Sequence, residues 1–300
     1  MRLEWLAFSD PVTIWWDFLV LVSAGNIALL LSLWRRFHQT GRLPGAGPFG
    51  LQPLLLLSAA YVLGCAFRSV LPRADVQRIC LFYTWLSSVV VGRSVATVAE
   101  LCFILQWAIV LRALARIARA EKVRHVATAV VPLIAVAELC SWYAVVTTDY
   151  LGNVLENSLW TAAFLLVAAA LLDLAGRFRG MVRLAIMAAV AGIGGYALFM
   201  CTVDLPMYFV RWQAQLASGK EFFGFASGLH DVTTRWIVTH DFARWKGEIA
   251  WMSLYFSAAV WTSLLLASFR LVMRLPARYL ANPPPLLARR EAGGDGRPLR

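Results

Sequence analysis

Seven long apolar stretches, separated by short polar connections, occupy most of this 300-residue chain. A helix needs about 20 predominantly apolar residues to cross the hydrocarbon core of a bilayer, which is about 30 Å thick. Each stretch approaches that length. The stretches begin near Val12, Leu51, Ser94, Val126, Ser158, Leu184 and Ile249. The pattern predicts an all-α, polytopic membrane protein whose seven transmembrane helices form one bundle over residues 1–275.

Two connections between the predicted helices have a character of their own. Residues 79–92 are apolar but too few to cross a bilayer alone. We expect them to form an interfacial segment on the outer side, with a break at Gly92–Arg93 before the third helix. The outer loop 207–247 is long and rich in aromatic and charged residues, with helical stretches expected at 209–216 and 231–244. Loops of this length are often functional.

The distribution of basic residues predicts the orientation. Positively charged loops stay on the cytoplasmic side of a membrane. The basic residues concentrate in alternate connections and in the tail: Arg35, Arg36 and Arg42; Arg112, Arg116, Arg119, Lys122 and Arg124; Arg177, Arg179 and Arg183; Arg270, Arg274, Arg278, Arg289, Arg290, Arg297 and Arg300. The connection near Asp149 and Glu156 has none. The N-terminus is therefore predicted outside and the C-terminus inside a bacterial inner membrane or a plasma membrane.

Composition and charge indicate which binding partners to expect. The chain is 60% hydrophobic and 15% charged, and its net charge is +11. The basic residues recur between apolar stretches and form no single face, so the lipid bilayer is the expected partner and nucleic acid is not. Residues 276–300 contain Pro283–Pro285 and a Gly/Arg/Asp-rich run, a composition typical of a disordered basic cytoplasmic tail. A membrane or cytoplasmic partner protein would have to transmit any signal.

Ionisable residues within the predicted helices are the candidate binding site. Such residues cost about 2.5–3.5 kcal/mol each near the bilayer centre and turn towards partners or water. Here they concentrate in the outer half of the helices, and Glu138 lies deepest. The candidate pocket comprises Arg68, Arg93, Glu100, Glu138, Asp204, Glu248 and Tyr255. Two interpretations remain open: ion pairs that hold the bundle together, or an outward-facing polar and aromatic pocket.

A second set of polar residues lies in the long outer loop. His230-Asp231 recurs as His240-Asp241, and imidazole and carboxylate groups suit zinc or a similar ion. The ten-residue spacing matches no known zinc motif, and both aspartates could instead cap helices. Cys65 and Cys80 both fall towards the outer side, where a disulfide is a second open question.

Other residues bear on cofactors. Haem held between helices needs histidines inside them, and an opsin-type Schiff base needs a lysine in the seventh helix. The four histidines and the lysines all lie in loops, at helix ends or outside helix middles: His38, His125, His230, His240, Lys122, Lys220 and Lys246. Neither haem nor retinal is therefore expected.

Three functions fit this pattern. The favoured one is ligand binding or sensing, with a ligand that enters from outside and shifts helix packing. The alternative is a membrane-embedded enzyme at the extracytoplasmic face, such as a metal-dependent hydrolase, with Glu138 or Glu248 as acid/base and His230 and His240 as ligands or bases. A transporter is the third candidate. Transporters often have broken helices and internal repeats, and the only hint of these here is a group of glycines in the sixth predicted helix.

Overall fold

The computed structural model describes residues 10–39 and 52–272, and these form an all-α bundle. Seven helices are long and apolar enough to cross a membrane, as expected of an integral multi-pass membrane protein. The predicted all-α class and the seven apolar helices are thus confirmed. The tail 276–300 and Arg42 lie outside the described residues.

The first five crossings are single helices, and the last two are composite. The single helices are α1 (Pro11–Gln39), α2 (Gln52–Val70), α3 (Val89–Ala118), α4 (Glu121–Thr147) and α5 (Tyr150–Ala175). The sixth crossing joins α6 (Gly180–Phe199), a π-helical segment η3 (Met200–Asp204) and α7 (Leu205–Ala217). The seventh joins α9 (Phe242–Leu254), a π-helical segment η4 (Tyr255–Ala259) and α10 (Val260–Val272).

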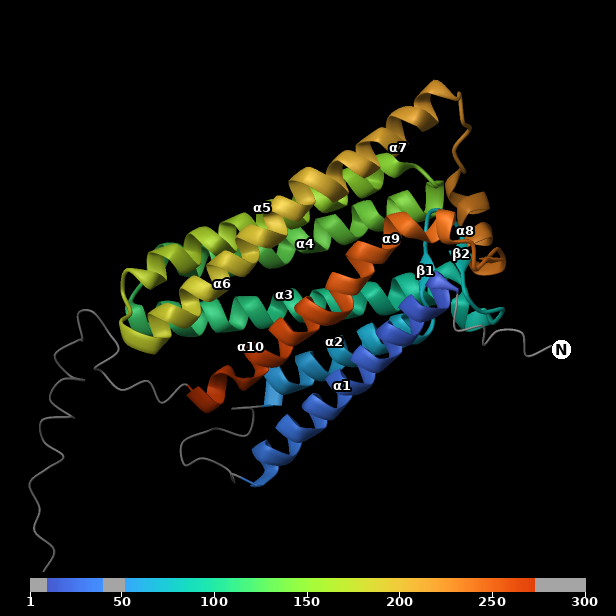
Figure 1. The fold of residues 1–300 in the computed structure, drawn as a ribbon. Helices are drawn as coiled ribbons and strands as arrows, with labels where there is room; N and C mark the ends of the chain where they lie inside the picture. Colours follow the sequence, from blue (N-terminus) through green and yellow to red (C-terminus); the bar gives the residue numbers. More distant parts are fainter. Residues whose placement is uncertain (1–9, 40–51, 273–300) are drawn as a thin grey trace, which may run out of the picture.

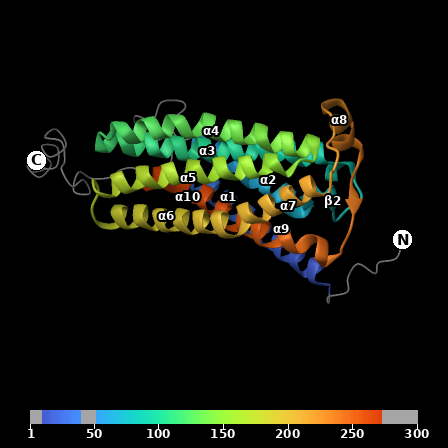
Figure 2. The same cartoon turned by 90° about the horizontal axis from the view of Figure 1, so that it is seen from above.

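One end of the bundle carries all three short strands and α8 (Phe225–Thr234), and we call it the strand end (Figures 1 and 2). The strands are β1 (Arg73–Ala74), β2 (Ile79–Cys80) and β3 (Ile237–Val238). β1 pairs antiparallel with β2, which pairs parallel with β3. The strands therefore join the connection after α2 to the connection after α8. We call residues 71–88 and 218–241 together the cap.

The connections differ from the sequence-based expectation in their extent. The helix expected at 209–216 is present as part of α7, which continues to Ala217. The single helix expected at 231–244 is wrong, because α8 ends at Thr234, β3 follows and α9 begins only at Phe242. Asp241 begins α9, because its carboxylate accepts a hydrogen bond from the Ala243 amide at 2.9 Å. The predicted interfacial segment 79–92 contains β2 and a single 3₁₀ turn, Trp85–Ser87, and α3 begins before Gly92. Gly92 serves close packing instead, since a Cβ there would collide with the Arg73 guanidinium.

Arg78 fastens the cap to the bundle. Its side chain is 3% exposed and donates to the Asp231 carboxylate at 2.7 Å, the Asp75 carbonyl at 2.6 Å and the Val145 carbonyl at 2.7 Å. Three separate segments, the β1–β2 turn, α8 and the end of α4, thus meet at one guanidinium. Gly228 of α8 lies against the Val146 backbone, where any side chain would collide with a carbonyl oxygen.

Asn26 of α1 completes the π-helical segment of the seventh crossing. A π turn leaves backbone groups without their usual helical partners. The Asn26 amide nitrogen donates to the Phe256 carbonyl at 2.9 Å, and its amide oxygen accepts from the Trp261 indole at 3.0 Å. The side chain is 3% exposed. This polar residue within an apolar helix therefore joins α1 to the seventh crossing.

The interior away from the strand end is mainly apolar, although Ser58, Gln106 and Ser263 are fully buried in it. α3 is the most enclosed crossing. Of the residues in its most apolar stretch, 56% are buried, against 17% in the sixth crossing at the edge of the bundle. Beyond Glu100, α3 contributes Phe103, Ile104, Leu111 and Leu114 to the core. Within the described part of the chain, every buried charged side chain lies in the strand-end half.

Replacing Arg78 should separate the cap from the bundle. Arg78→Ala leaves the buried Asp231 carboxylate and the Val145 carbonyl without their donor, and we expect a loss of about 3–5 kcal/mol in unfolding free energy. The measurement is denaturant unfolding of the purified protein in detergent. Arg235→Ala is the matched control, because Arg235 also contacts Asp231, at 3.6 Å, but is 56% exposed. It should cost about 1 kcal/mol or less. Equal losses for both variants would refute this role of Arg78.

Removing the amide of Asn26 should destabilise the seventh crossing. Asn26→Leu leaves the Phe256 carbonyl and the Trp261 indole unpaired, at a cost of about 1–3 kcal/mol for each unsatisfied group. Ser32→Ala, on the same helix but exposed and bonded only to its own backbone turn, should leave the unfolding midpoint unchanged. The prediction fails if Asn26→Leu matches the wild type in thermal unfolding in detergent.

Candidate functional site

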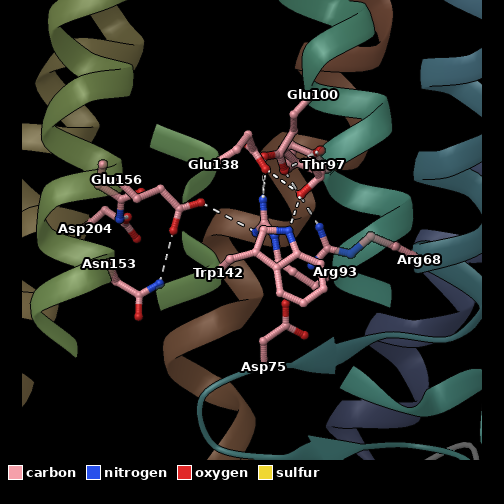
Figure 3. A network of polar contacts seen from close by, with 12 residues as sticks. Arg68, Asp75, Arg93, Thr97, Glu100, Glu138, Trp142, Asn153, Glu156 and Asp204 are labelled. Atoms are coloured by element: carbon pink, nitrogen blue, oxygen red, sulfur yellow. Dashed lines mark hydrogen bonds and ion pairs between the residues drawn. The ribbon is translucent and has the colours of Figure 1, made fainter. Parts of the chain in front are cut away.

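Charged side chains from five segments converge inside the strand-end half of the bundle (Figure 3). None of them exposes more than 11% of its side chain. We call this set the central cluster, and its members are Arg68 of α2, Arg73 and Asp75 of the cap, Arg93 and Glu100 of α3, Glu138 of α4 and Glu156 of α5. The cluster lies between the cap and the apolar interior.

The Arg93 guanidinium is the centre of the cluster. Its Nη2 atom lies 2.9 Å from Glu100 and 2.5 Å from Glu138, and its Nη1 atom lies 3.5 Å from Glu156 (Figure 3). Arg93 and Glu100 are seven residues apart, which places them on one face of α3. Guanidinium is suited to this position because it presents five donors in a fixed plane.

Neutral side chains orient the carboxylates. The Thr97 hydroxyl donates to Glu138 at 2.7 Å and accepts from the Trp142 indole at 3.1 Å. The Tyr255 hydroxyl, from η4, donates to Glu100 at 2.9 Å. The Asn153 amide donates to Glu156 at 3.2 Å. Each glutamate therefore has a fixed orientation, and the seventh crossing reaches the cluster through Tyr255.

The cap supplies an ion pair of its own. Arg73 contacts Asp75 at 2.7 Å and also donates to the Ser88 carbonyl. Burial alone would raise the pKa of the Asp75 carboxyl, but Arg73, Arg68 and Arg93 together hold that pKa below its usual value. Asp75 is thus ionised at neutral pH. Arg68 lies between Asp75 and Glu100, at 3.9 Å from the latter.

The cluster contains more carboxyl groups than guanidinium groups. Four carboxyl groups (Asp75, Glu100, Glu138, Glu156) face three guanidinium groups (Arg68, Arg73, Arg93). Full ionisation would leave one uncompensated negative charge in an interior of low dielectric, which is costly. The cluster is therefore electrically neutral only when it holds one further positive charge.

Several buried polar atoms of the cluster have no hydrogen-bond partner among the described residues. They include acceptors and donors alike: Oε1 of Glu138, Oδ1 of Asn153, Nε of Arg68 and Nε of Arg93. Most buried polar groups in proteins are satisfied, so such a group of unsatisfied atoms indicates a place for water or a small ligand.

The three glutamates also have the geometry of potential metal ligands. Among the described residues, Glu100, Glu138 and Glu156 are the one group of three or more ligand-type side chains whose oxygens lie within 4.8 Å of one another. The Arg93 guanidinium contacts all three carboxylates. A positive group of the protein itself thus already occupies the position between them, and we assign no metal ligands here.

The remaining residues of the predicted pocket form a separate pair of contacts. Asp204, in η3, accepts a hydrogen bond from Asn157 at 2.7 Å. Glu248, in α9, contacts Arg211 and accepts from Gln77, both at 2.9 Å. Within the described chain, neither carboxylate has an ion pair or a hydrogen bond with the central cluster. The structure therefore brings Arg68, Arg93, Glu100, Glu138 and Tyr255 together.

The residues predicted as metal ligands have other surroundings. His230 is exposed on α8, Asp231 is bound to Arg78, Asp241 caps α9 and His240 is half-buried. The four do not form a group with ligand spacing among the described residues. Cys65 and Cys80 are both free thiols, so the disulfide considered above is absent. Cys65 lies within α2, whereas Cys80 belongs to β2, where it pairs with β3.

Comparison of the chain with known protein families, with curated proteins and with solved structures found no match. The residues of the site are therefore the basis for any functional conclusion.

A double-mutant cycle should show that Arg93 compensates the glutamates. Arg93→Met leaves three buried carboxylates without their shared cation, and we expect a loss of roughly 3–5 kcal/mol in unfolding free energy. Adding Glu138→Gln removes one of those charges, so the double variant should regain part of the loss. Arg112→Met, at an exposed site on the same helix, is the control. Strictly additive losses of the two substitutions would contradict the coupling.

Proposed function

We propose that this protein is a sensing or binding protein of a bacterial inner membrane or a plasma membrane. In this proposal the strand end faces outwards, and the central cluster binds a small positively charged ligand from that side. Binding changes how the cap packs on the bundle. A membrane or cytoplasmic partner protein then reads the change.

The unequal number of carboxyl and guanidinium groups is the observation that carries this proposal. Ion pairs that only held the bundle together would need equal numbers of both charges and no unsatisfied atoms. The central cluster instead has one carboxyl group in excess, with unsatisfied oxygens on Glu138 and Asn153. A small cation would supply the missing charge. A larger ligand would not fit the cluster as it is packed, because no member exposes more than 11% of its side chain.

The positions of the basic residues support an outward-facing strand end. The ends of α1 and α3 and the starts of α4 and α6, all opposite the strand end, carry exposed or half-buried arginines and lysines. At the strand end, Arg68, Arg73 and Arg78 are buried and paired with acids. Among the described residues, the exposed arginines and lysines there are Lys220, Arg235, Arg244 and Lys246, which are fewer than at the opposite end. Paired, buried charges add little to the field that holds a loop in the cytoplasm.

The absence of buried charged side chains beyond the cluster, among the described residues, favours binding over transport. A transported ion needs polar groups along its path, at binding sites near the bilayer midplane and beyond. Beyond the cluster, the described core consists mainly of apolar side chains such as Phe103, Ile104, Leu111 and Leu114. Its buried polar side chains there include Ser58, Gln106 and Ser263, but no charged side chain is buried there among the described residues. A site that is filled and emptied from one face needs no charged groups beyond it.

A fluorescent label on the cap should report both orientation and response. In a variant whose five native cysteines are replaced, Lys220→Cys should react with a membrane-impermeant maleimide in intact cells, whereas Lys122→Cys should react only after lysis. In nanodiscs, the Lys220→Cys label should change its emission when the pH or the concentration of Na⁺, Mg²⁺ or Ca²⁺ is varied. Glu138→Gln should abolish that response.

Glu121→Gln is the matched control, because Glu121 is exposed and pairs with Arg124 at the opposite end. It should leave the response unchanged. Absence of a response to every one of these cations would overturn the proposed function, and labelling of Lys122→Cys in intact cells would reverse the orientation.

A further inference from the structure

We infer that the central cluster holds one exchangeable proton, shared between the carboxyl groups of Glu100 and Glu138. This inference rests on the proposed function, in which the cluster binds a small cation, and it names that cation. The proton would enter and leave from the cap side.

The hydrogen bonds of the two glutamates identify the position of the proton. Both oxygens of Glu100 already accept hydrogen bonds, Oε1 from Tyr255 and Oε2 from Arg93. Oε2 of Glu138 accepts from Arg93 and Thr97. Oε1 of Glu138 has no partner among the described residues, although the two carboxylates lie close together. A proton on this atom gives it a hydrogen bond to donate and removes the repulsion between the two carboxylates.

A proton fits this position better than a metal ion. Ca²⁺ and Mg²⁺ require six or more oxygen ligands arranged around the ion. Here Arg93 contacts all three glutamates, and Nε of Arg68 and Nε of Arg93 are donors that would repel a metal. A proton needs no coordination shell. It also supplies one positive charge, which equals the excess of carboxyl over guanidinium groups.

The groups that face the shared proton come from every element packed around it. They are Tyr61, Cys65 and Arg68 of α2, Arg73 and Asp75 of the cap, Arg93 of α3, Glu156 of α5, Tyr196 of the sixth crossing, and Tyr255 of η4. Asp204 lies further out, next to Tyr196. Asp204 has no ion pair within the described chain, so a second protonated carboxyl group can exist there. The test therefore uses differences between variants rather than the wild-type signal alone.

Loss of the proton would destabilise the packing of the cap on the bundle. It would leave two facing carboxylates with one guanidinium between them, buried where their repulsion is strong. The elements that carry them are also those against which the cap packs. The cap contacts α3 through Arg73 at Gly92, and α4 through Gly228 at Val146 and Arg78 at Val145. Deprotonation is thus expected to loosen the contact between the cap and the bundle, which connects the pH outside to the structure.

Infrared difference spectroscopy in nanodiscs tests the inference directly, because a protonated carboxyl group has a carbonyl absorption that a carboxylate lacks. At neutral pH the spectrum of Glu138→Gln should lack one such band of the wild type, and Glu100→Gln should lack the same band. Glutamine is nearly isosteric and removes the excess charge, so both variants should fold. Glu121→Gln should retain every protonated-carboxyl band of the wild type.

The wild type provides a second measurement that needs no variant. Its protonated-carboxyl band should disappear as the pH is raised, and its melting temperature should fall over the same range. The melting temperature of Glu138→Gln should stay constant there. An unchanged band in both glutamine variants, or a wild-type band that does not titrate, would overturn the shared proton.

Melting temperatures with and without metal ions distinguish failure of this inference from failure of the proposed function. If Ca²⁺ or Mg²⁺ raises the melting temperature of the wild type but not of Glu138→Gln, and no protonated-carboxyl band is lost in that variant, the ligand is a metal ion and only the proton assignment fails. If neither pH nor any cation distinguishes the two proteins, the proposed function fails as well.

Discussion

The contact of one guanidinium with three carboxylates organises this membrane protein. Arg93 connects α3 with α4 and α5, and Arg68 and Tyr255 extend the contacts to α2 and the seventh crossing. Buried ion pairs often contribute little net stability, because desolvation offsets their attraction. Their effect is to select one arrangement, since any other would leave charges unpaired in a low dielectric. The cluster thus determines which helix faces meet in the strand-end half of the bundle.

The surroundings of the cluster differ between its two sides. On one side, the described core is mainly apolar and contains no buried charged side chain. On the other, the cap is held by hydrogen bonds and by a few close backbone contacts. Arg78 alone joins three segments of the cap and the bundle. A small change of charge next to this cap can alter its packing, because hydrogen-bonded contacts between separate segments have discrete arrangements. The sensing proposed above would use this coupling between the cluster and the cap.

Much of the fold could be predicted from the sequence, and the site only in part. Long apolar stretches predict crossings because lipid demands continuous backbone hydrogen bonding. Arg93, Glu100 and Glu138 were predictable because charges are costly within such stretches. Glu156 and Asp75 were missed because both lie where the sequence indicates connections, and only the packing of α5 and the cap brings them inwards. The π-helical segments carry no sequence pattern that we recognise, so the role of Asn26 became evident only from the Phe256 carbonyl.

The number of protons that the folded protein releases tests the account most directly. Potentiometric titration of nanodisc-embedded wild type and Glu138→Gln, from neutral to alkaline pH, compares the two cluster compositions without a label. The excess carboxyl group predicts that the wild type releases one more proton per chain than the variant over this range. Superimposable titration curves would contradict the account, because they would mean that the cluster of the wild type releases no additional proton over this range.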